Sequence, residues 1–317
     1  MDSILVLGGT GFLGRAVCEE LVRQGGGAGG RLIVPTRQPL HGRQLLPLPS
    51  VEIAQADVHD DHTLARLVAG RDAVINLVGI LHGSSADFER AHVALPRRIA
   101  QACMRAGVRR VVHVSALGAQ AGGPSHYLRS KAAGEAALKG AELDLTVLRP
   151  SVMFGAEDHF LNLFARLSRR LPVLPLAGAH SRLQPVWVDD VARGMAACLV
   201  RPDTIGLTLE CAGPRVTTLR ELVEAVGRWS GHPRRVIPIS DSLARLQIAL
   251  LSLLPGEPLM TQDNLLSLGV PNIATGGLPT LYKLGIDPAP LEAVAPLILG
   301  NYLQARLVRW RAVARKG

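Results

Sequence analysis

The stretch ILVLGGTGFLG, residues 4–14, decides the fold of this chain. It joins a short apolar run to an amphipathic stretch through Gly8, Gly11 and Gly14. Glycine permits a tight turn, lets the backbone approach a pyrophosphate and allows a helix to pack closely on a sheet. The start of that helix offers free N–H groups and the positive end of its dipole to the phosphates. The stretch therefore predicts a strand, a loop and a helix that bind a dinucleotide.

The same alternation of apolar runs and amphipathic stretches continues through the first half of the chain. The apolar runs are continuous, which indicates strands covered on both faces; they span residues 4–7, 32–34, 51–54, 73–78, 111–114 and 145–148. The amphipathic stretches 15–23, 62–68, 88–105 and 130–138 supply crossover helices. We therefore expect an α/β fold with a Rossmann doubly wound parallel sheet. Residues 1–155 are predicted to form the NAD(P)-binding core, and residues 156–317 the last Rossmann elements interleaved with a smaller mixed C-terminal domain.

Composition and cysteine usage limit the class of protein. The chain has 317 residues, 48% of them hydrophobic and 19% charged, as in a folded soluble protein. Its four cysteines have neither metal-site nor disulfide-framework spacing, so we expect buried thiols in a reducing compartment, and no metal site. The late apolar run 246–254 is shorter than the roughly 20 residues of a membrane helix. These features predict a cytoplasmic protein without a membrane span.

The end of the second predicted strand bears on the choice of cofactor. A fold that prefers NAD places Asp or Glu about 20 residues after the glycine loop, where the carboxylate holds the ribose 2′-hydroxyl. Here Arg37 stands in that region. A guanidinium can hold a 2′-phosphate through paired charge-assisted hydrogen bonds, whereas a carboxylate would repel it. We therefore favour NADPH or NADP over NADH or NAD. Arg43 can share this role, and the alternative is that Arg37 is an ordinary surface arginine.

Polar and small residues also follow the third and fourth predicted strands. Asp57 is placed to accept a hydrogen bond from an adenine amino group. Gly79, at the end of Asn76 to Gly79, would let the backbone pass close to the cofactor ribose. Ligands bind at the carboxyl ends of strands in open α/β sheets, although either residue can equally be a plain loop residue.

Ser115, Tyr127 and Lys131 form a candidate catalytic set. Ser115 ends the fifth predicted strand, while Tyr127 and Lys131 are four positions apart and share one helix face. A phenol has a pKa of about 10, but an adjacent ammonium and an oxidised nicotinamide both favour the phenolate. Tyr127 could then exchange a proton with a substrate hydroxyl or carbonyl, while Ser115 orients the oxygen. The alternative is a solvated tyrosine and lysine.

The chain resembles the short-chain dehydrogenase/reductase superfamily, in its extended or atypical, NAD-dependent epimerase-like branch. The motifs that carry the resemblance are GGTGFLG (8–14), NLVG (76–79), VHVSALGA (112–119), YLRSK (127–131), LRPSVMFG (148–155) and QPVWVDDVA (184–192). The resemblance implies an oxidoreductase or epimerase-type enzyme that acts on a small molecule, whose identity the sequence leaves open. We place the cofactor contacts on Gly8, Thr10, Gly11, Phe12, Leu13, Gly14, Arg37, Asp57, Val58, Leu77, Val78, Gly79, Lys131, Pro150 and Val152.

Within that superfamily the chain is most similar to the NADPH-binding accessory subunit of respiratory complex I and its bacterial relatives. IVPTR (33–37), FGAEDHFLNLFA (154–165) and LPGEPLMTQDNLLSL (254–268) carry this similarity. It implies a nucleotide that is bound structurally, without turnover of a substrate. A non-catalytic structural or assembly protein is thus the alternative to an enzyme.

The C-terminal tail is basic. Of the +9 net charge, five positive residues follow the last acidic residue: Arg306, Arg309, Arg311, Arg315 and Lys316. From Leu299 the pattern predicts an amphipathic helix that can lie on the inner face of a membrane, or contact a respiratory complex. The alternative is a terminal helix packed on its own domain. Motifs for binding RNA or DNA are lacking, so we expect no nucleic acid partner.

Overall fold

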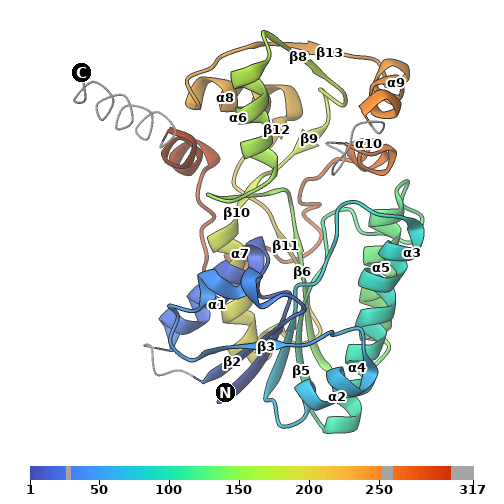
Figure 1. Ribbon diagram of the computed structural model, residues 1–317, viewed down its shortest axis with the longest axis vertical. Coiled ribbons are helices and arrows are strands. Elements are labelled where there is room, and N and C mark those ends of the chain that lie inside the picture. The colour runs from blue at the N-terminus through green and yellow to red at the C-terminus, as the bar shows by residue number, and fades with distance from the viewer. Residues whose placement is uncertain (26–29, 252–259, 301–317) are drawn as a thin grey trace, which may run out of the picture.

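The computed structural model describes residues 1–25, 30–251 and 260–300. Its centre is a seven-stranded, entirely parallel sheet with the order β11-β6-β5-β4-β1-β2-β3 (Figure 1). In that order the strands are Thr208–Cys211, Asp144–Pro150, Arg110–Val114, Ala73–Asn76, Ser3–Leu7, Arg31–Thr36 and Val51–Gln55. The predicted doubly wound α/β fold is confirmed.

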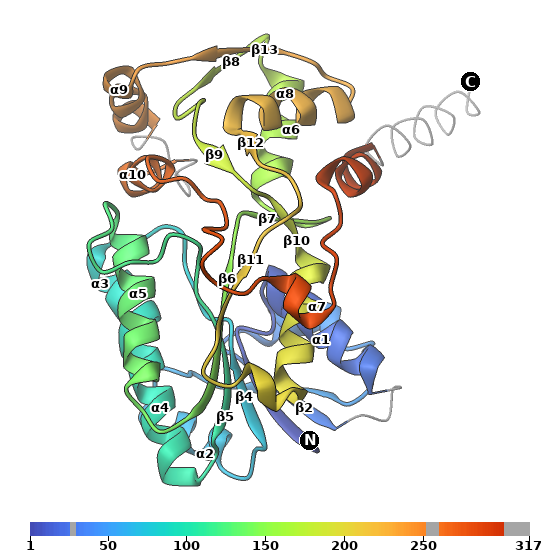
Figure 2. The same cartoon turned by 180° about the vertical axis from the view of Figure 1, so that it is seen from behind.

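Helices cover both faces of the sheet, as continuous hydrophobicity in its strands requires. One face carries α1 (Phe12–Gln24) and α7 (Val188–Val200), which pack against each other. The other face carries α2 (Asp61–Val68), α4 (Leu95–Ala106) and α5 (His126–Lys139). The two layers lie on opposite sides of the strands in both views (Figures 1 and 2). Because α7 and β11 come from the second half of the chain, that half completes both the sheet and one helical layer.

Two boundaries differ from the sequence prediction for local reasons. The predicted strand 73–78 ends at Asn76, because the side-chain Oδ1 of Asn76 accepts a hydrogen bond from the Val78 N–H at 3.2 Å and turns the chain. The predicted helix 88–105 is divided into α3 (Ser85–Glu89), a wide π-helical turn η2 (Arg90–Ala94) and α4. Pro96 has no N–H for the His92 carbonyl four residues earlier, which explains the wide turn.

A second, smaller body lies beyond the carboxyl ends of the strands and has its own hydrophobic core (Figures 1 and 2). Its helices are α6 (Phe160–Arg170), α8 (Leu219–Trp229), α9 (Asp241–Leu251) and α10 (Gln262–Leu268). Its short strands pair as β7 (Met153–Phe154) with β10 (Val186–Trp187), β8 (Val173–Leu176) with β13 (Arg235–Pro238), and β9 (Arg182–Leu183) with β12 (Thr217–Thr218). Short turns lie at η1 (Pro39–Leu45), η3 (Pro202–Thr204) and η4 (Leu281–Leu284). Residues 291–300 are also helical and contribute to the core of the smaller body.

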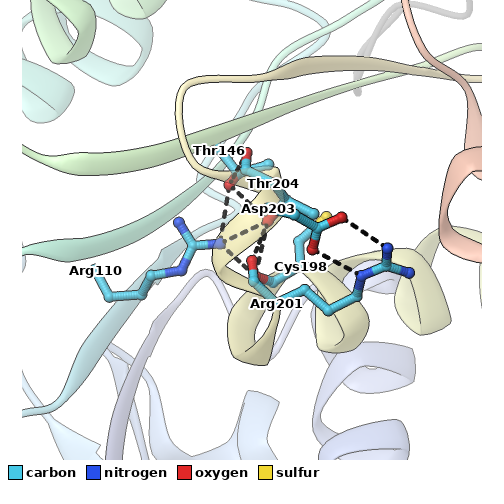
Figure 3. Close-up of polar contacts among 6 residues, drawn as sticks. All are labelled: Arg110, Thr146, Cys198, Arg201, Asp203 and Thr204. Carbon is cyan, nitrogen blue, oxygen red and sulfur yellow. Dashed lines mark hydrogen bonds and ion pairs between the residues drawn. The ribbon is translucent and has the colours of Figure 1, made fainter.

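At the amino end of β5, the buried guanidinium of Arg110 joins several elements. Its nitrogens donate to the hydroxyl groups of Thr146 and Thr204, at 2.9 and 3.2 Å, and to backbone carbonyls including that of Cys198 (Figure 3). These partners belong to β6, η3 and α7. We call this group the Arg110 network, and its partners are carbonyl and hydroxyl oxygens of the protein itself.

The four cysteines are free and buried, as predicted, and burial raises the pKa of Cys18 and of Cys103 to about 12. Among the described residues, the structure contains no helix with the length and apolar character that crossing a membrane requires. The predicted tail helix falls almost entirely on residues 301–317, outside the described residues.

Candidate functional site

The glycine loop between β1 and α1 is shaped by close backbone contacts. Gly8 has a φ of +78°, a conformation that favours glycine. A Cβ atom on Gly14 would lie 2.3 Å from the carbonyl oxygen of Gly8, so the helix can approach the loop only because position 14 lacks a side chain. A Cβ on Gly11 would meet only the Gly8 oxygen, at 3.3 Å. The loop is therefore tight on the side of the sheet and open beside Gly11.

The start of α1 is suited to an anion. Its first turn contains no acidic residue, and its N-cap, Gly11, makes no side-chain hydrogen bond to it. The positive end of the helix dipole thus faces the open side of the loop. The residues present fit a bound pyrophosphate.

Basic side chains gather where β2 and β3 end. Arg37 follows β2 and is exposed, and Asp57 follows β3, with its Oδ2 4.0 Å from a guanidinium nitrogen of Arg90. Burial lowers the pKa of the nearby His59, and the charges of Arg90 and Arg37 lower it further. Asp57 opposes this effect. Arg37 and Arg90 therefore both bring positive charge to the end of the sheet predicted to hold the adenosine.

The loop after β4 lies against α5. A Cβ on Gly79 would be 3.5 Å from Nε2 of His92 and 3.6 Å from Nζ of Lys131. The structure thus brings Gly79 and Lys131, predicted from separate motifs, to one place. A side chain at position 79 would project toward both groups.

Ser115 and Lys131 also meet at the end of β5. The Lys131 ammonium is buried and donates to the Val114 carbonyl at 2.8 Å. Ser115 Oγ is buried without a hydrogen bond of good geometry, although it lies close enough to Glu135 to lower the pKa of that carboxyl. Buried hydroxyl groups are normally paired, so an unpaired one is an available contact for a ligand.

Tyr127 lies one turn before Lys131 on α5, as predicted. Its ring packs edge-on against His92, with 5.7 Å between the ring centroids, and against Phe88 at 6.3 Å. Tyr127 is only partly buried, whereas Phe88 and His92 are almost fully buried. The two buried rings therefore hold one side of the phenol while another part of it stays accessible.

The protonation of this pair differs in part from the sequence expectation. Burial raises the pKa of Tyr127 to about 12 and lowers the pKa of Lys131 to about 8. Burial is the cause of the raised pKa of Tyr127, and the expected lowering by the ammonium does not contribute to it. Tyr127 is a protonated phenol at neutral pH, and so a proton donor.

His92 links the loop after β4 to α5. Its Nε2 accepts from the Ile80 N–H at 3.0 Å, so Nδ1 carries the proton and lies 2.8 Å from Ser130 Oγ. The Ser130 hydroxyl donates in turn to the Tyr127 carbonyl at 2.8 Å. Burial, reinforced by the charge of Lys131, lowers the pKa of His92 to about 3, so the ring stays neutral. Sequence reasoning missed His92, because a lone histidine on a helix carries no motif.

Glu135 is a second buried group that the sequence motifs did not identify. Burial would raise its pKa, but hydrogen bonds from Arg149, both at 2.8 Å, and the charges of Arg149 and Lys139 lower it overall. It therefore stays ionised beside Ser115 and Lys131. The side chains of Glu135 and Arg149 meet only through the fold, since they lie on α5 and β6.

The remaining predicted contacts lie at the same ends of the strands. Thr10, Phe12 and Leu13 belong to the glycine loop and the first turn of α1, Val58 follows β3, Leu77 and Val78 follow β4, and Pro150 and Val152 lie at and just after the end of β6. The Pro150 carbonyl accepts from the Leu117 N–H at 3.0 Å, which holds the end of β6 beside the segment that follows Ser115. No predicted site residue lies outside this region.

A cavity of about 310 Å³ lies elsewhere, in the smaller body, lined by Pro185, Thr217, Glu221 and Trp229 among others. It contains none of the predicted catalytic or cofactor residues. We assign the candidate site to the ends of the strands because the glycine loop, the unpaired Ser115 hydroxyl and the Tyr127–Lys131 pair converge there.

Comparison with known proteins shows the family of the chain. The model of a family described as NAD(P)H-binding matches residues 8–202. The chain is 35% identical over 312 residues to NADH dehydrogenase [ubiquinone] 1 alpha subcomplex subunit 9, mitochondrial, of Rattus norvegicus, covering 96% of this chain and 81% of that protein. It is 31% identical over 244 residues to a ceramide reductase of Caulobacter vibrioides, covering 75% of this chain and 74% of that protein.

Among solved structures, the chain is similar to a nucleoside-diphosphate-sugar epimerase from Staphylococcus aureus. The TM-score is 0.71 at 19% sequence identity, over 92% of this chain and 98% of that one. At this identity the likeness concerns the fold alone.

Proposed function

The chain belongs to the NAD(P)H-binding family, and from that premise we propose that it is an NADPH-dependent reductase of the short-chain dehydrogenase/reductase type. The observation that carries the proposal is the buried Ser115 hydroxyl, which lacks a hydrogen bond of good geometry and follows Val114, the residue whose carbonyl binds the Lys131 ammonium. Tyr127 lies one turn before Lys131 on the same helix. The sequence-predicted cofactor contacts belong to the same proposal.

NADPH, when bound, supplies a hydride to a substrate carbonyl, and the residues of the chain supply the proton and the orientation. Tyr127, with its raised pKa, is a neutral phenol and donates a proton to the carbonyl oxygen. Ser115 Oγ, whose contact with Glu135 falls short of good hydrogen-bond geometry, donates a hydrogen bond to the same oxygen. The Lys131 ammonium stabilises the charge that remains on Tyr127 after the transfer.

We propose Arg37 as the residue that selects NADPH over NADH. It is exposed at the end of β2, and Arg90 adds positive charge nearby. A 2′-phosphate would form charge-assisted hydrogen bonds there, which a 2′-hydroxyl would not. Replacing Arg37 with Ala should weaken NADPH binding about 10- to 100-fold and leave NADH binding unchanged. The control is Arg105→Ala, which removes an exposed arginine from the last turn of α4, and both variants are measured by titration calorimetry.

The reductase itself is tested by NADPH oxidation with a panel of carbonyl compounds. The panel includes ceramide-type substrates, because one relative is named a ceramide reductase. Tyr127→Phe should lower turnover by about 10² to 10⁴ while the dissociation constant of NADPH stays within a few-fold. The control is Tyr282→Phe, which removes an exposed phenol from η4. Equal turnover in both variants would exclude Tyr127 as the proton donor.

A second function is favoured by one observation, the similarity over 96% of the chain to a subunit of NADH dehydrogenase. In that alternative the protein binds NADPH as a structural subunit or assembly factor of a respiratory complex. Tight NADPH binding, with no oxidation by any compound of the panel, would support it. Binding of neither nucleotide would exclude both functions.

A further inference from the structure

One segment of the smaller body crosses the ends of the strands and contacts the candidate site repeatedly. We call residues 260–280 the strap; it includes α10 and is seen beside the start of α5 in both views (Figures 1 and 2). Beyond α10, Asn272 Oδ1 accepts from the Val152 N–H at 2.9 Å and the Ser151 hydroxyl at 2.6 Å. The strap thereby holds the segment after β6.

The firmest contact of the strap is with the helix that carries Tyr127. The first N–H groups of a helix have no partner within the helix. In α5, the side chain of the N-cap Ser125 accepts from one of these N–H groups, that of Leu128, at 3.2 Å. The N–H groups of His126 and Tyr127 donate instead to the two carboxylate oxygens of Asp263, at 2.6 and 3.0 Å. A side chain 136 positions away thus holds the main chain of Tyr127.

Two neighbours of Asp263 strengthen this arrangement. Ser267 Oγ donates to Ser125 Oγ at 2.8 Å, so the strap also contacts the N-cap itself. Asn264 Nδ2 donates to the Leu81 carbonyl at 3.1 Å, in the loop that follows β4. Asn264 also accepts from the N–H of Thr261, which fixes the start of α10. Asp263 therefore lies on a short helix that contacts both α5 and the loop after β4.

Tyr127 and Lys131 lie in different turns of α5, and Asp263 contacts only the first of these two turns. Lys131 lies in the second turn of α5 and is held by the Val114 carbonyl. Tyr127 lies in the first turn, which is the part of a helix that frays when its caps are removed. We propose that Asp263 is a positioning residue, which fixes the first turn of α5 and thereby keeps the Tyr127 phenol aligned with Lys131 and Ser115. This inference rests on the proposed reductase function.

The test compares Asp263→Asn and Asp263→Ala in the full chain. Asn retains one acceptor oxygen for the two N–H groups and Ala retains none, so the defect should be graded. We expect turnover to fall about tenfold in Asn and about a hundredfold in Ala, because small misplacements of a reacting group are costly. The Michaelis constant of the carbonyl and the dissociation constant of NADPH should each stay within about twofold.

The control variant is Asp60→Ala. Asp60 caps α2 through the Thr63 N–H at 2.8 Å, the same kind of contact at a helix that carries no catalytic residue. A merely structural role of Asp263 would make both alanine variants alike: less stable, with wild-type turnover. That result, or wild-type turnover in Asp263→Ala alone, would overturn the inference.

If the wild-type protein turns over no carbonyl compound, the proposed function fails and a second measurement decides. The chain contains three tyrosines, so the ring signal of Tyr127 can be assigned in tyrosine-labelled protein by NMR. Asp263→Ala should shift or broaden that signal and Asp60→Ala should leave it unchanged. An unaltered Tyr127 signal in Asp263→Ala would overturn the inference, whatever the outcome for turnover.

Discussion

At the amino end of β5, Arg110 donates to hydroxyl and carbonyl oxygens of three other elements (Figure 3), whereas at the carboxyl end, Ser115 Oγ has no partner of good geometry. Both groups are buried, and one short strand separates them. The amino end is a closed polar network that stabilises the fold. Under the proposed function, the carboxyl end keeps the Ser115 hydroxyl and glycine backbone for a ligand, so that stability and function would occupy opposite ends of the same strand.

We expect the largest effect on the free energy of unfolding from replacing Arg110, the side chain at the centre of the Arg110 network. Arg110→Met keeps an apolar stem of similar length but leaves several buried oxygens without donors. We expect the free energy of unfolding to fall by about 3 to 5 kcal/mol, measured by chemical denaturation. NADPH affinity of the folded fraction should not change, since Arg110 lies at the far end of β5. Weaker NADPH binding would show that the amino end of β5 also affects the nucleotide site, and would contradict the separation of stability and binding between the two ends of the strand.

At the carboxyl end of β5, buried Lys131 should make the free energy of unfolding depend on pH. Burial lowers the pKa of Lys131 from an ordinary 10.5 to about 8. Between these pH values the unfolded chain binds a proton that the folded protein releases, so this group makes the folded state more stable as pH rises. The wild-type free energy of unfolding should therefore gain up to about 3 kcal/mol relative to Lys131→Met between pH 8 and 10.5.

The control for this measurement is Lys283→Met, because Lys283 is exposed on η4. Its difference from the wild type should stay constant over the same pH range. If the difference in the free energy of unfolding between the wild type and Lys131→Met is also constant over this range, burial does not lower the pKa of Lys131.

A matched pair of hydroxyl deletions sharpens the comparison. At the closed end, Thr146 Oγ1 accepts from Arg110 at 2.9 Å and donates to the Thr204 carbonyl at 2.8 Å. Thr146→Val preserves the shape of the side chain and removes both bonds. We expect a loss of about 1 to 2 kcal/mol in the free energy of unfolding, with turnover unchanged. A neutral result would mean that the Arg110 network adds little stability.

The smallest effect on stability is expected for Ser115, at the carboxyl end of β5. Ser115→Ala removes a hydroxyl that has no good partner, so the free energy of unfolding should change by less than about 0.5 kcal/mol or rise slightly. Turnover should nonetheless fall about a hundredfold, as when a donor to a reacting oxygen is removed. A loss of stability as large as that of Thr146→Val would show that Ser115 is already paired within the protein.

The sheet and the glycine loop follow from local sequence. Continuous apolar runs predicted the first six strands, and the spacing of Gly8, Gly11 and Gly14 predicted the turn into α1. These features depend on residues within a few positions of one another, and so they can be predicted from the sequence.

The groups that surround the catalytic set do not follow in the same way. Asp263 contacts residues 136 and 137 positions away, and Arg149 meets Glu135 only after β6 has paired with β5. No short motif encodes such a pair. The raised pKa of Tyr127 likewise depends on burial by Phe88 and His92, which sequence spacing did not reveal.

The strap also has a consequence for biosynthesis. At roughly 5 to 20 residues per second, the ribosome adds Asp263 on the order of 7 to 27 s after Tyr127. When Cys211 has been added, 52 residues before Asp263, the nascent chain contains all seven strands of the sheet, and with them the glycine loop. Under the proposed function, the glycine loop and the sheet are thus synthesised before Asp263, the residue that fixes the first turn of α5, so the phenol is the last part of the site to be positioned.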